Sequence, residues 1–288
     1  MRVHVMTRGG GMREEYAFLG EPPGEYWWQR YEAVTNFQLP SLLVESDRDG
    51  WRLYLAPITM TMVGPGGTSI GMVLVLEGAH GDPDDDVDRV PELVGLWLDP
   101  ERGAAEVSRT FSAAFPQDSR TITEWRAATG DRAGRLVTGG FRTAVRELRA
   151  RDVAASPVAT ADRWAGAVDG RASRAAFVHR IGELLHGAQG RAVVANYCLE
   201  PDVHDGLAGY PVLGEPDTGP LALLVQRSDD SLGDAPVELP VSRGKALSRP
   251  PEPESASVAR SGVGTRTRIL VSLLLMGVLL VFGLLVVL

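Results

Sequence analysis

Three side chains of the types that bind metal ions lie at helical spacing in the second half of the sequence. His179, Glu183 and His186 stand at positions i, i+4 and i+7, so on a helix they share one face. Imidazole and carboxylate groups are common zinc ligands, but a site needs further ligands, and no other candidate stands at a helpful spacing. The apolar residues of the same segment fall on the opposite face. We therefore predict that this trio faces solvent and that the chain holds no metal, with these three residues as its metal-ligand candidates.

A serine motif of hydrolases occurs in the first third of the chain. Gly67, Ser69 and Gly71 match the pattern Gly-x-Ser-x-Gly, in which the serine occupies a tight turn leading from a strand into a helix. Here a Pro-Gly pair comes before the pattern and a strand-like segment follows it. The context predicts a hairpin turn instead of a catalytic serine.

Two other patterns resemble ligand-binding loops but lack residues that those loops require. Asp82, Asp84, Asp86 and Asp88 alternate as in the opening of a calcium-binding loop, yet valine and leucine stand where that loop has glycine and glutamate. Gly9–Gly11 follows a short apolar segment, as phosphate-binding loops do, but no Gly-Lys-Ser/Thr or Gly-x-Gly-x-x-Gly pattern is present. We predict a solvated acidic turn and a hairpin turn.

An aromatic group follows a Pro-Pro pair near the N-terminus. Its members are Tyr26, Trp27, Trp28, Tyr31 and Phe37. Large aromatic side chains bury the most apolar area, so core packing is the prediction. Because tryptophan and tyrosine also dominate binding sites, a recognition pocket is the alternative.

The charge of the chain argues against one class of partner. The first 245 residues contain 25 basic and 35 acidic residues, so this part is strongly acidic. Sequence-independent binding of nucleic acid depends on neutralising phosphates with basic side chains. We therefore expect no nucleic-acid partner, and no motif in the sequence predicts a cofactor.

Charge is also unevenly distributed along the chain. Residues 77–101 hold nine acidic side chains against a single arginine, whereas residues 119–151 hold eight arginines against three acidic side chains. In the second segment Arg142, Arg146 and Arg149 form a flank at helical spacing. This flank is either a solvated helix edge or a docking face for anionic lipid head groups or an acidic partner.

Apolar periodicity and turn residues predict an α+β fold. A strand-rich N-terminal half is expected, and the Asp47–Gly50 turn should join two of its strands as a hairpin. Amphipathic helices are expected in the middle, around Phe141–Leu148 and Phe177–Ala188, with Ser173 as the N-cap of the second. The expected strands are Arg2–Met6, Tyr16–Leu19, Ser41–Glu45, Trp51–Ile58 and Ile70–Glu77, with two later ones at Ala192–Cys198 and Leu221–Gln226.

The predicted domain organisation has three parts. Residues 1–245 form a cytoplasmic globular region, with a weak internal boundary at residues 152–170, and residues 246–268 form a linker rich in proline, serine and arginine. Residues 269–288 carry no charge and are almost all large and apolar. At about 1.5 Å per residue a helix of this length spans about 30 Å, the thickness of a bilayer core. We predict a transmembrane helix.

The flanks of this segment predict its orientation. Arg260, Arg266 and Arg268 precede it and no basic residue follows, so the N-terminal side is expected in the cytoplasm. No secretory signal peptide is visible in the first residues, and the single cysteine, Cys198, fits a reducing compartment. Lys245 is the only lysine among the basic residues, a bias that indicates a GC-rich bacterial genome. The chain is thus expected to be a tail-anchored, single-pass protein of a bacterial inner membrane.

Two functional interpretations follow. The first is a non-enzymatic interaction, recruitment or regulatory module that binds a cytoplasmic protein partner at the membrane, within a multi-component bacterial system. The second is a membrane-anchored hydrolase or metal-dependent enzyme, because catalytic groups assemble from distant positions that no motif reveals. The lack of an intact catalytic motif favours the interaction module.

Overall fold

The computed structural model describes residues 1–8, 15–63, 69–81, 86–99, 101, 103–148, 161–196, 211–214, 219–226 and 234–239. The chain divides into two compact units, Met1–Arg243 and Gly244–Leu288, and all described residues belong to the first. The predicted linker and the predicted transmembrane segment lie outside the described residues. Across the described ranges, no helix combines the length and the apolar character needed to cross a membrane.

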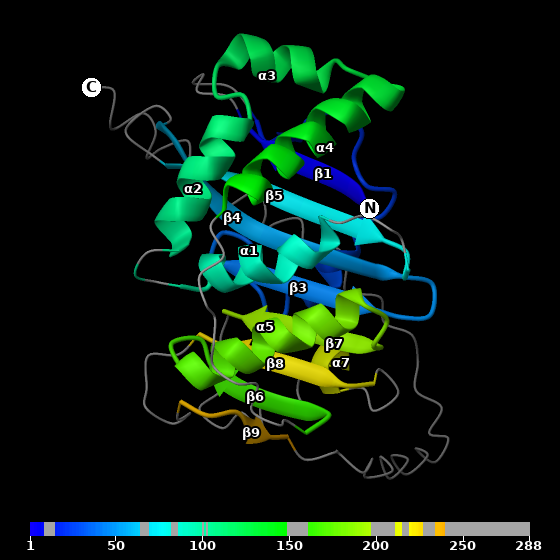
Figure 1. Cartoon of the computed structure of the whole chain (residues 1–288), viewed down its shortest axis with the longest axis vertical. Coiled ribbons are helices and arrows are strands. Elements are labelled where there is room, and N and C mark those ends of the chain that lie inside the picture. Colours follow the sequence, from blue (N-terminus) through cyan, green and yellow to red (C-terminus); the bar gives the residue numbers. More distant parts are fainter. Residues whose placement is uncertain are drawn as a thin grey trace, which may run out of the picture. The chain divides into compact units, whose positions relative to one another are not determined.

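One mixed sheet runs through the first unit (Figure 1). Its nine described strands lie in the order β2-β1-β5-β4-β3-β7-β8-β6-β9. They are β1 (Arg2–Thr7), β2 (Ala17–Phe18), β3 (Ser41–Ser46), β4 (Trp51–Val63), β5 (Ser69–Gly78), β6 (Arg163–Ala167), β7 (Gly190–Ala195), β8 (Leu221–Val225) and β9 (Val237–Glu238). The first five strands pair antiparallel, β7, β8 and β6 pair parallel, and β3 joins the two halves by pairing antiparallel with β7.

Helices cover one face of this sheet. Figure 1 shows α1, α2, α4 and α5 lying in front of the strands. The described helices of eight or more residues are α1 (Val90–Trp97), α2 (Gly103–Ala114), α3 (Ser119–Arg126), α4 (Gly130–Glu147) and α5 (Arg171–Leu185). The shorter ones are the 3-10 helices η1 (Trp27–Tyr31) and η3 (Val87–Arg89) and the single turn α7 (Pro211–Gly214). The fold is therefore mixed α+β, as the sequence predicted, and its described strands form one large sheet.

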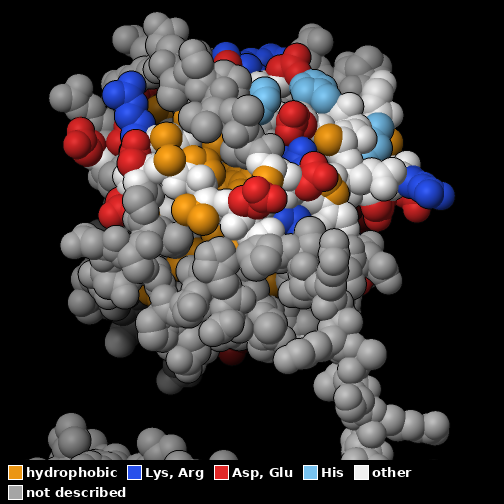
Figure 2. Space-filling view, turned by 90° about the horizontal axis from the view of Figure 1, so that it is seen from below, with side chains coloured by type: hydrophobic (Ala, Val, Ile, Leu, Met, Phe, Trp, Pro, Cys, Tyr) orange, Lys and Arg blue, Asp and Glu red, His pale blue; other side chains and the backbone are white. Residues whose placement is uncertain are grey.

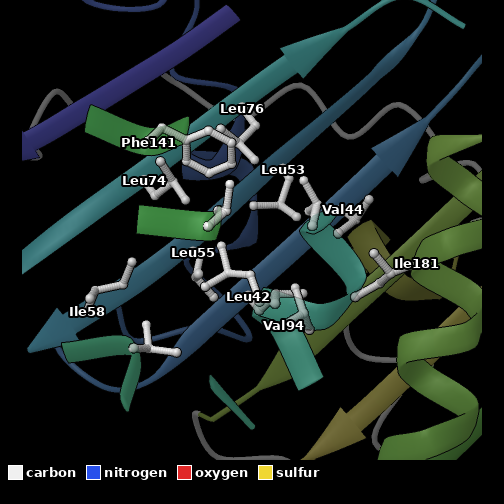
Figure 3. Close-up of a cluster of buried hydrophobic side chains, with 14 of the residues drawn as sticks. Leu42, Val44, Leu53, Leu55, Ile58, Leu74, Leu76, Val94, Phe141 and Ile181 are labelled. Carbon is white, nitrogen blue, oxygen red and sulfur yellow. The ribbon is translucent and has the colours of Figure 1, made fainter. Parts of the chain in front are cut away.

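Both faces of the sheet carry a hydrophobic core. Side chains of a strand alternate between faces, so Leu42 and Val44 of β3 pack under the helices while Leu43 faces the other way. Figure 3 shows Leu42, Val44 and Phe141 of α4 in the helix-covered core. The opposite core is closed by side chains of η1 and α7. Because both faces are covered, β3, β7 and β8 are buried along their whole length.

Several sequence predictions are confirmed by these elements. The five N-terminal strands lie where they were expected, and Asp47–Gly50 joins β3 to β4 with Asp47 N donating to the Gly50 carbonyl oxygen at 3.0 Å. The two predicted helices are α4 and α5, and α4 begins earlier, at Gly130. Residues 163–167, inside the segment considered as an internal boundary, form β6 of the same sheet.

The starts of α3 and α5 show two kinds of capping. Asp118 caps α3 locally, because its carboxylate accepts a hydrogen bond from Thr121 N at 2.8 Å, which lowers the pKa of the carboxyl. For α5 the prediction of Ser173 as N-cap was wrong: Gly170 is the N-cap and Ser173 is buried inside the first turn. Its backbone N and Oγ both donate to the carbonyl oxygen of Asp234, at 3.1 and 2.8 Å. A distant residue thus satisfies the donors that a local cap would satisfy.

Two glycines provide a test of this packing. A Cβ at Gly166 would lie 2.4 Å from Ser173 Oγ, whereas a Cβ at Gly139 of α4 would meet nothing within 4 Å. We expect Gly166→Ala to lower the free energy of unfolding by about 1–3 kcal/mol, since the buried first turn of α5 must shift. As its control, Gly139→Ala should raise that free energy by about 0.5–1 kcal/mol, because alanine favours the helix. Urea denaturation of the full chain measures both, and equal shifts would contradict the contact at Gly166.

Candidate functional site

A cavity of about 460 Å³ opens where four strands of the antiparallel half end. Its walls come from the start of β1, the end of β3, the turn into β4, and the end of β5. Its charged side chains are Glu45, Asp47, Asp49, Glu77, Arg2 and Arg52, and Met1 also lines it. Trp51, Gly50, Gly78 and Ala79 add apolar and backbone surface. The volume falls within the range of small-ligand sites, and the lining is rich in charge.

The buried carboxylate of Glu45 forms the inner wall of this cavity. The side chain of Glu45 is only 9% exposed and contacts three donors. Tyr31 Oη donates to its Oε1 at 2.5 Å, Arg52 Nε donates to its Oε2 at 2.9 Å, and Arg30 also donates to Oε1. Burying a carboxylate is unfavourable unless it is paired and hydrogen-bonded, and here both oxygens are satisfied. The wall is therefore fixed from two elements, η1 and β4.

Charged residues form a row across five strands on the face of the sheet opposite the helices. Directly paired positions place Arg2 beside Glu77, Glu77 beside Arg52, Arg52 beside Glu45, and Glu45 beside Arg191. Each neighbour in this charge row has the opposite sign, which stabilises cross-strand pairs. Arg2 and Glu77 form an ion pair at 3.2 Å, and Arg52 and Glu45 form one at 2.9 Å. The row gives the cavity a fixed pattern of charge.

The surroundings of Glu45 determine its protonation state. Burial raises the pKa of the carboxyl, but hydrogen bonds from Arg30 and Tyr31 and the positive charges of Arg30 and Arg52 outweigh burial and hold the pKa below its usual range. Burial, followed by the negative charge of Glu45, raises the pKa of the Tyr31 hydroxyl. At neutral pH Glu45 is ionised and Tyr31 keeps the proton that it donates.

The outer rim of the cavity is the tight turn between β3 and β4. Asp47 Oδ1 accepts hydrogen bonds from the backbone N of Asp49 and Gly50, at 2.9 and 3.2 Å. His80 Nε2 lies 2.8 Å from the Asp47 carbonyl oxygen and holds the turn from the side of β5. A Cβ at Gly50 would overlap the Gly78 carbonyl oxygen, so this close approach requires glycine. The turn therefore presents its two aspartates at the cavity from a defined backbone.

The structure places His179 and Glu183 on an exposed face of α5 and His186 at the C-cap of that helix, with side chains that are 55%, 43% and 61% exposed. His179 Nε2 lies 3.6 Å from Glu183 Oε1, whereas His186 Nε2 lies 3.1 Å from Asp88 of η3. Figure 2 shows histidine side chains beside acidic ones at the surface. No three His, Cys, Asp or Glu side chains of the described ranges are arranged to hold one metal ion. The trio lies in solvent, outside the cavity.

The serine motif and the aromatic group have structural positions. Ser69 is the exposed first residue of β5 and pairs with Val63 in an antiparallel ladder, so it lacks the strand-to-helix turn of a nucleophile elbow. Trp27, Trp28 and Tyr31 are buried in the core opposite the helices, which confirms the packing prediction for these three residues. The remaining members of the group differ, because Tyr26 is 46% exposed and Phe37 is half-buried at the edge of the core.

Two arginines of the predicted docking face bind an acidic side chain of the same chain. Arg142 Nε donates to Asp86 Oδ2 at 2.6 Å, and Arg146 Nε lies 3.4 Å from Asp86 Oδ1. The Asp86 side chain is 5% exposed, so this pair fixes α4 to the segment before η3. Arg149 lies outside the described residues, as do Gly9–Gly11, Asp82 and Asp84, Cys198 and the arginines at 260, 266 and 268. A docking role for the flank stays a prediction.

Sequence reasoning did not identify Glu45 or Arg52 as site residues. A signal was present, because the Asp47–Gly50 turn fixes the hairpin register and thereby places Glu45 opposite Arg52. The contribution of Arg30 and Tyr31 had no such signal, since η1 contacts β3 only through tertiary packing. Comparison of the chain with protein-family models, curated proteins and solved structures finds no match.

The Glu45 network predicts a pH-dependent contribution to stability. We expect Glu45→Gln to lower the free energy of unfolding at neutral pH by about 2–4 kcal/mol, because Arg52 and Arg30 lose the buried anion with which they pair. The loss is limited because Arg30 is half exposed and solvent already screens its charge. The folded-state pKa of Glu45 is lowered, so the stabilisation is present above the unfolded-state pKa of about 4.3 and is lost as the pH falls below it. The difference between wild type and variant should therefore narrow in acid.

Urea denaturation of both full-length proteins, at neutral pH and below about pH 4, measures this change. The control is Glu124→Gln, which removes an exposed carboxylate paired with Arg120 on α3 and should change the free energy by less than about 1 kcal/mol. A difference between wild type and Glu45→Gln that stays constant down to acid pH would contradict the assignment.

Proposed function

We propose that this chain is a membrane-tethered, non-enzymatic interaction module that binds a cytoplasmic partner at the bacterial inner membrane. The observation that carries the proposal is the charged cavity at the ends of β1, β3, β4 and β5. Its inner wall is fixed by ion pairs and hydrogen bonds, and its rim is a short turn open to solvent. A preorganised polar surface of this kind favours recognition, because little entropy is lost when a ligand binds.

The positions of the candidate catalytic groups support the same proposal. Ser69 lies in a strand ladder, and the trio on α5 is open to water on a helix surface. Glu45 is held ionised by its arginine partners, which is unfavourable for a group that must exchange protons near neutral pH. The alternative, a membrane-anchored hydrolase or metal-dependent enzyme, has no comparable geometric support among the described residues.

The tether itself is proposed from sequence. Residues 269–288 have the length and composition of a transmembrane helix, and Arg260, Arg266 and Arg268 precede them. The composition of residues 246–268 is that of a linker, which would let the globular part reorient at the membrane. An acidic binding module held at a membrane would hold its cytoplasmic partner there and raise the local concentration of that partner at the bilayer.

Partner binding is tested by affinity purification of the tagged full chain from detergent-solubilised membranes of the source organism. The expected result is a cytoplasmic protein that co-purifies at near-stoichiometric amounts, because a recruitment module forms a defined complex. A matched preparation of an unrelated single-pass protein controls for non-specific capture. Recovery of the chain without a partner, but with a tightly bound metal ion or substrate-like small molecule, would overturn the proposal in favour of the enzyme.

Membrane tethering predicts a specific effect of charge in the apolar segment. We expect the full chain to remain in the membrane fraction after alkaline carbonate washing. The double substitution Val278→Arg and Leu279→Arg should release it, because each arginine at the centre of a span costs about 2.5–3.5 kcal/mol. The control exchanges the same positions as Val278→Leu and Leu279→Val and should leave partitioning unchanged. Release of the wild-type chain by the wash would contradict the tether.

A further inference from the structure

We propose that the cavity at the ends of β1, β3, β4 and β5 recognises a cationic side chain, arginine in preference to lysine, on a segment of the partner protein. This inference rests on the proposed function, since it names the chemistry of the partner. Three features of the cavity support it: the ion pairs formed by its charged side chains, the separation of its carboxylates, and the apolar surface beside them.

The lining of the cavity holds four carboxylates and two arginines. Arg52 is bound to Glu45 at 2.9 Å and to Glu25 at 3.1 Å, so its charge is shared by two carboxylates. Arg2, which is 78% exposed, pairs with Glu77 at 3.2 Å. Both guanidiniums of the lining are therefore already engaged, and Met1, which lies in the same lining, is not free either.

Two carboxylates on the rim form no ion pair with the described part of the chain. Asp47 and Asp49 are exposed, and no arginine or histidine side chain of the described ranges forms an ion pair with either. Asp47 uses Oδ1 to bind the backbone of its own turn. Arg48, in the same turn, does not line the cavity. A ligand with positive charge would complete this side of the cavity, and the acidic character of the first 245 residues would attract it from a distance.

The spacing of the carboxylates decides between an inorganic and an organic cation. A divalent metal needs several oxygen ligands within about 2.0–2.6 Å of one point. No three acidic or histidine side chains within the described ranges converge in this way, and about 460 Å³ is far larger than a bare ion requires. An extended cation with delocalised charge can instead contact carboxylates that lie apart from one another.

The remaining lining suits the stem of such a side chain. Trp51, Gly78 and Ala79 give apolar and backbone surface beside the carboxylates. The methylene groups of arginine can lie along such surface while the guanidinium reaches the rim. Arginine presents several N–H groups in a planar fork, so it can bind a carboxylate with two parallel hydrogen bonds, whereas lysine cannot.

The test measures binding of short blocked peptides to the full chain in detergent by calorimetry. The probes are acetyl-Gly-Arg-Gly-amide, its lysine analogue, and its citrulline analogue, which has the shape of arginine without the charge. We expect the arginine peptide to bind at least about tenfold more tightly than the citrulline peptide and more tightly than the lysine peptide, with affinity that falls as salt rises.

The matched variants locate the site. Asp47→Asn combined with Asp49→Asn should weaken binding of the arginine peptide by about tenfold or more, because charge is lost while the amide oxygen of the new side chain in the turn can still accept its hydrogen bonds. The control, Glu32→Gln combined with Asp131→Asn, removes the same charge from exposed positions outside the cavity and should change the affinity less than about twofold.

Several outcomes would overturn the inference. One is that the arginine peptide does not bind, and another is that the citrulline peptide binds with the same affinity. A third is that the control variant loses as much affinity for the arginine peptide as the Asp47/Asp49 double variant. Tighter binding of ethylguanidinium, a free guanidinium compound with the same single charge, than of the peptide would assign the cavity to a small molecule and equally overturn the partner segment. A partner that co-purifies equally with the wild type and the Asp47/Asp49 double variant would leave the proposed function standing while this inference falls.

Discussion

The Glu45 carboxylate is the interaction on which the layer opposite the helices depends. Its place on β3 buries a negative charge between the sheet and η1, which is unfavourable unless each oxygen is satisfied. Arg30 and Tyr31 of η1 supply donors from above, and Arg52 supplies one from the neighbouring strand. The guanidinium of Arg52 also lies 4.8 Å from the centre of the Trp27 ring. Arg52 therefore links the buried carboxylate of Glu45 to the aromatic ring of Trp27. If η1 moved away from the sheet, both groups would be exposed to solvent.

The same strand is the junction between the two halves of the sheet. β3 pairs with β4 by a hairpin, which is a local connection, and with β7 across the chain, where the parallel part begins. Arg191 of β7 stands beside Glu45 and donates to the carbonyl oxygen of Val212 in α7. Arg163 of β6 donates to the next carbonyl, that of Leu213, at 2.6 Å. The charge row thus continues into contacts that hold α7 over the parallel strands.

The elements predicted from sequence are those whose signals are local. Apolar runs between turn residues located β1, β3, β4 and β5, and a helical stripe located α4 and α5, because those patterns are created within one segment. β6 was not predicted, since Arg163–Ala167 is short and becomes a strand through pairing with β8 far along the chain. The cap of α5 by Asp234 and the partners of Glu45 on η1 are likewise set by tertiary packing. The hairpin register made only the Glu45–Arg52 pair predictable.

The two oppositely charged segments of the chain contact each other in the fold. The acidic segment 77–101 and the arginine-rich segment 119–151 meet where Asp86 binds Arg142, and Arg89 of the acidic segment donates to the carbonyl oxygen of Leu148 after α4 at 3.0 Å. These contacts neutralise the charge of Asp86 within the helix layer. The Asp47–Gly50 turn differs, because its aspartates extend past the last pair of the charge row and face the cavity. Within the described part of the chain neither aspartate forms an ion pair, in contrast to Asp86, so both charges are available to attract a cationic ligand.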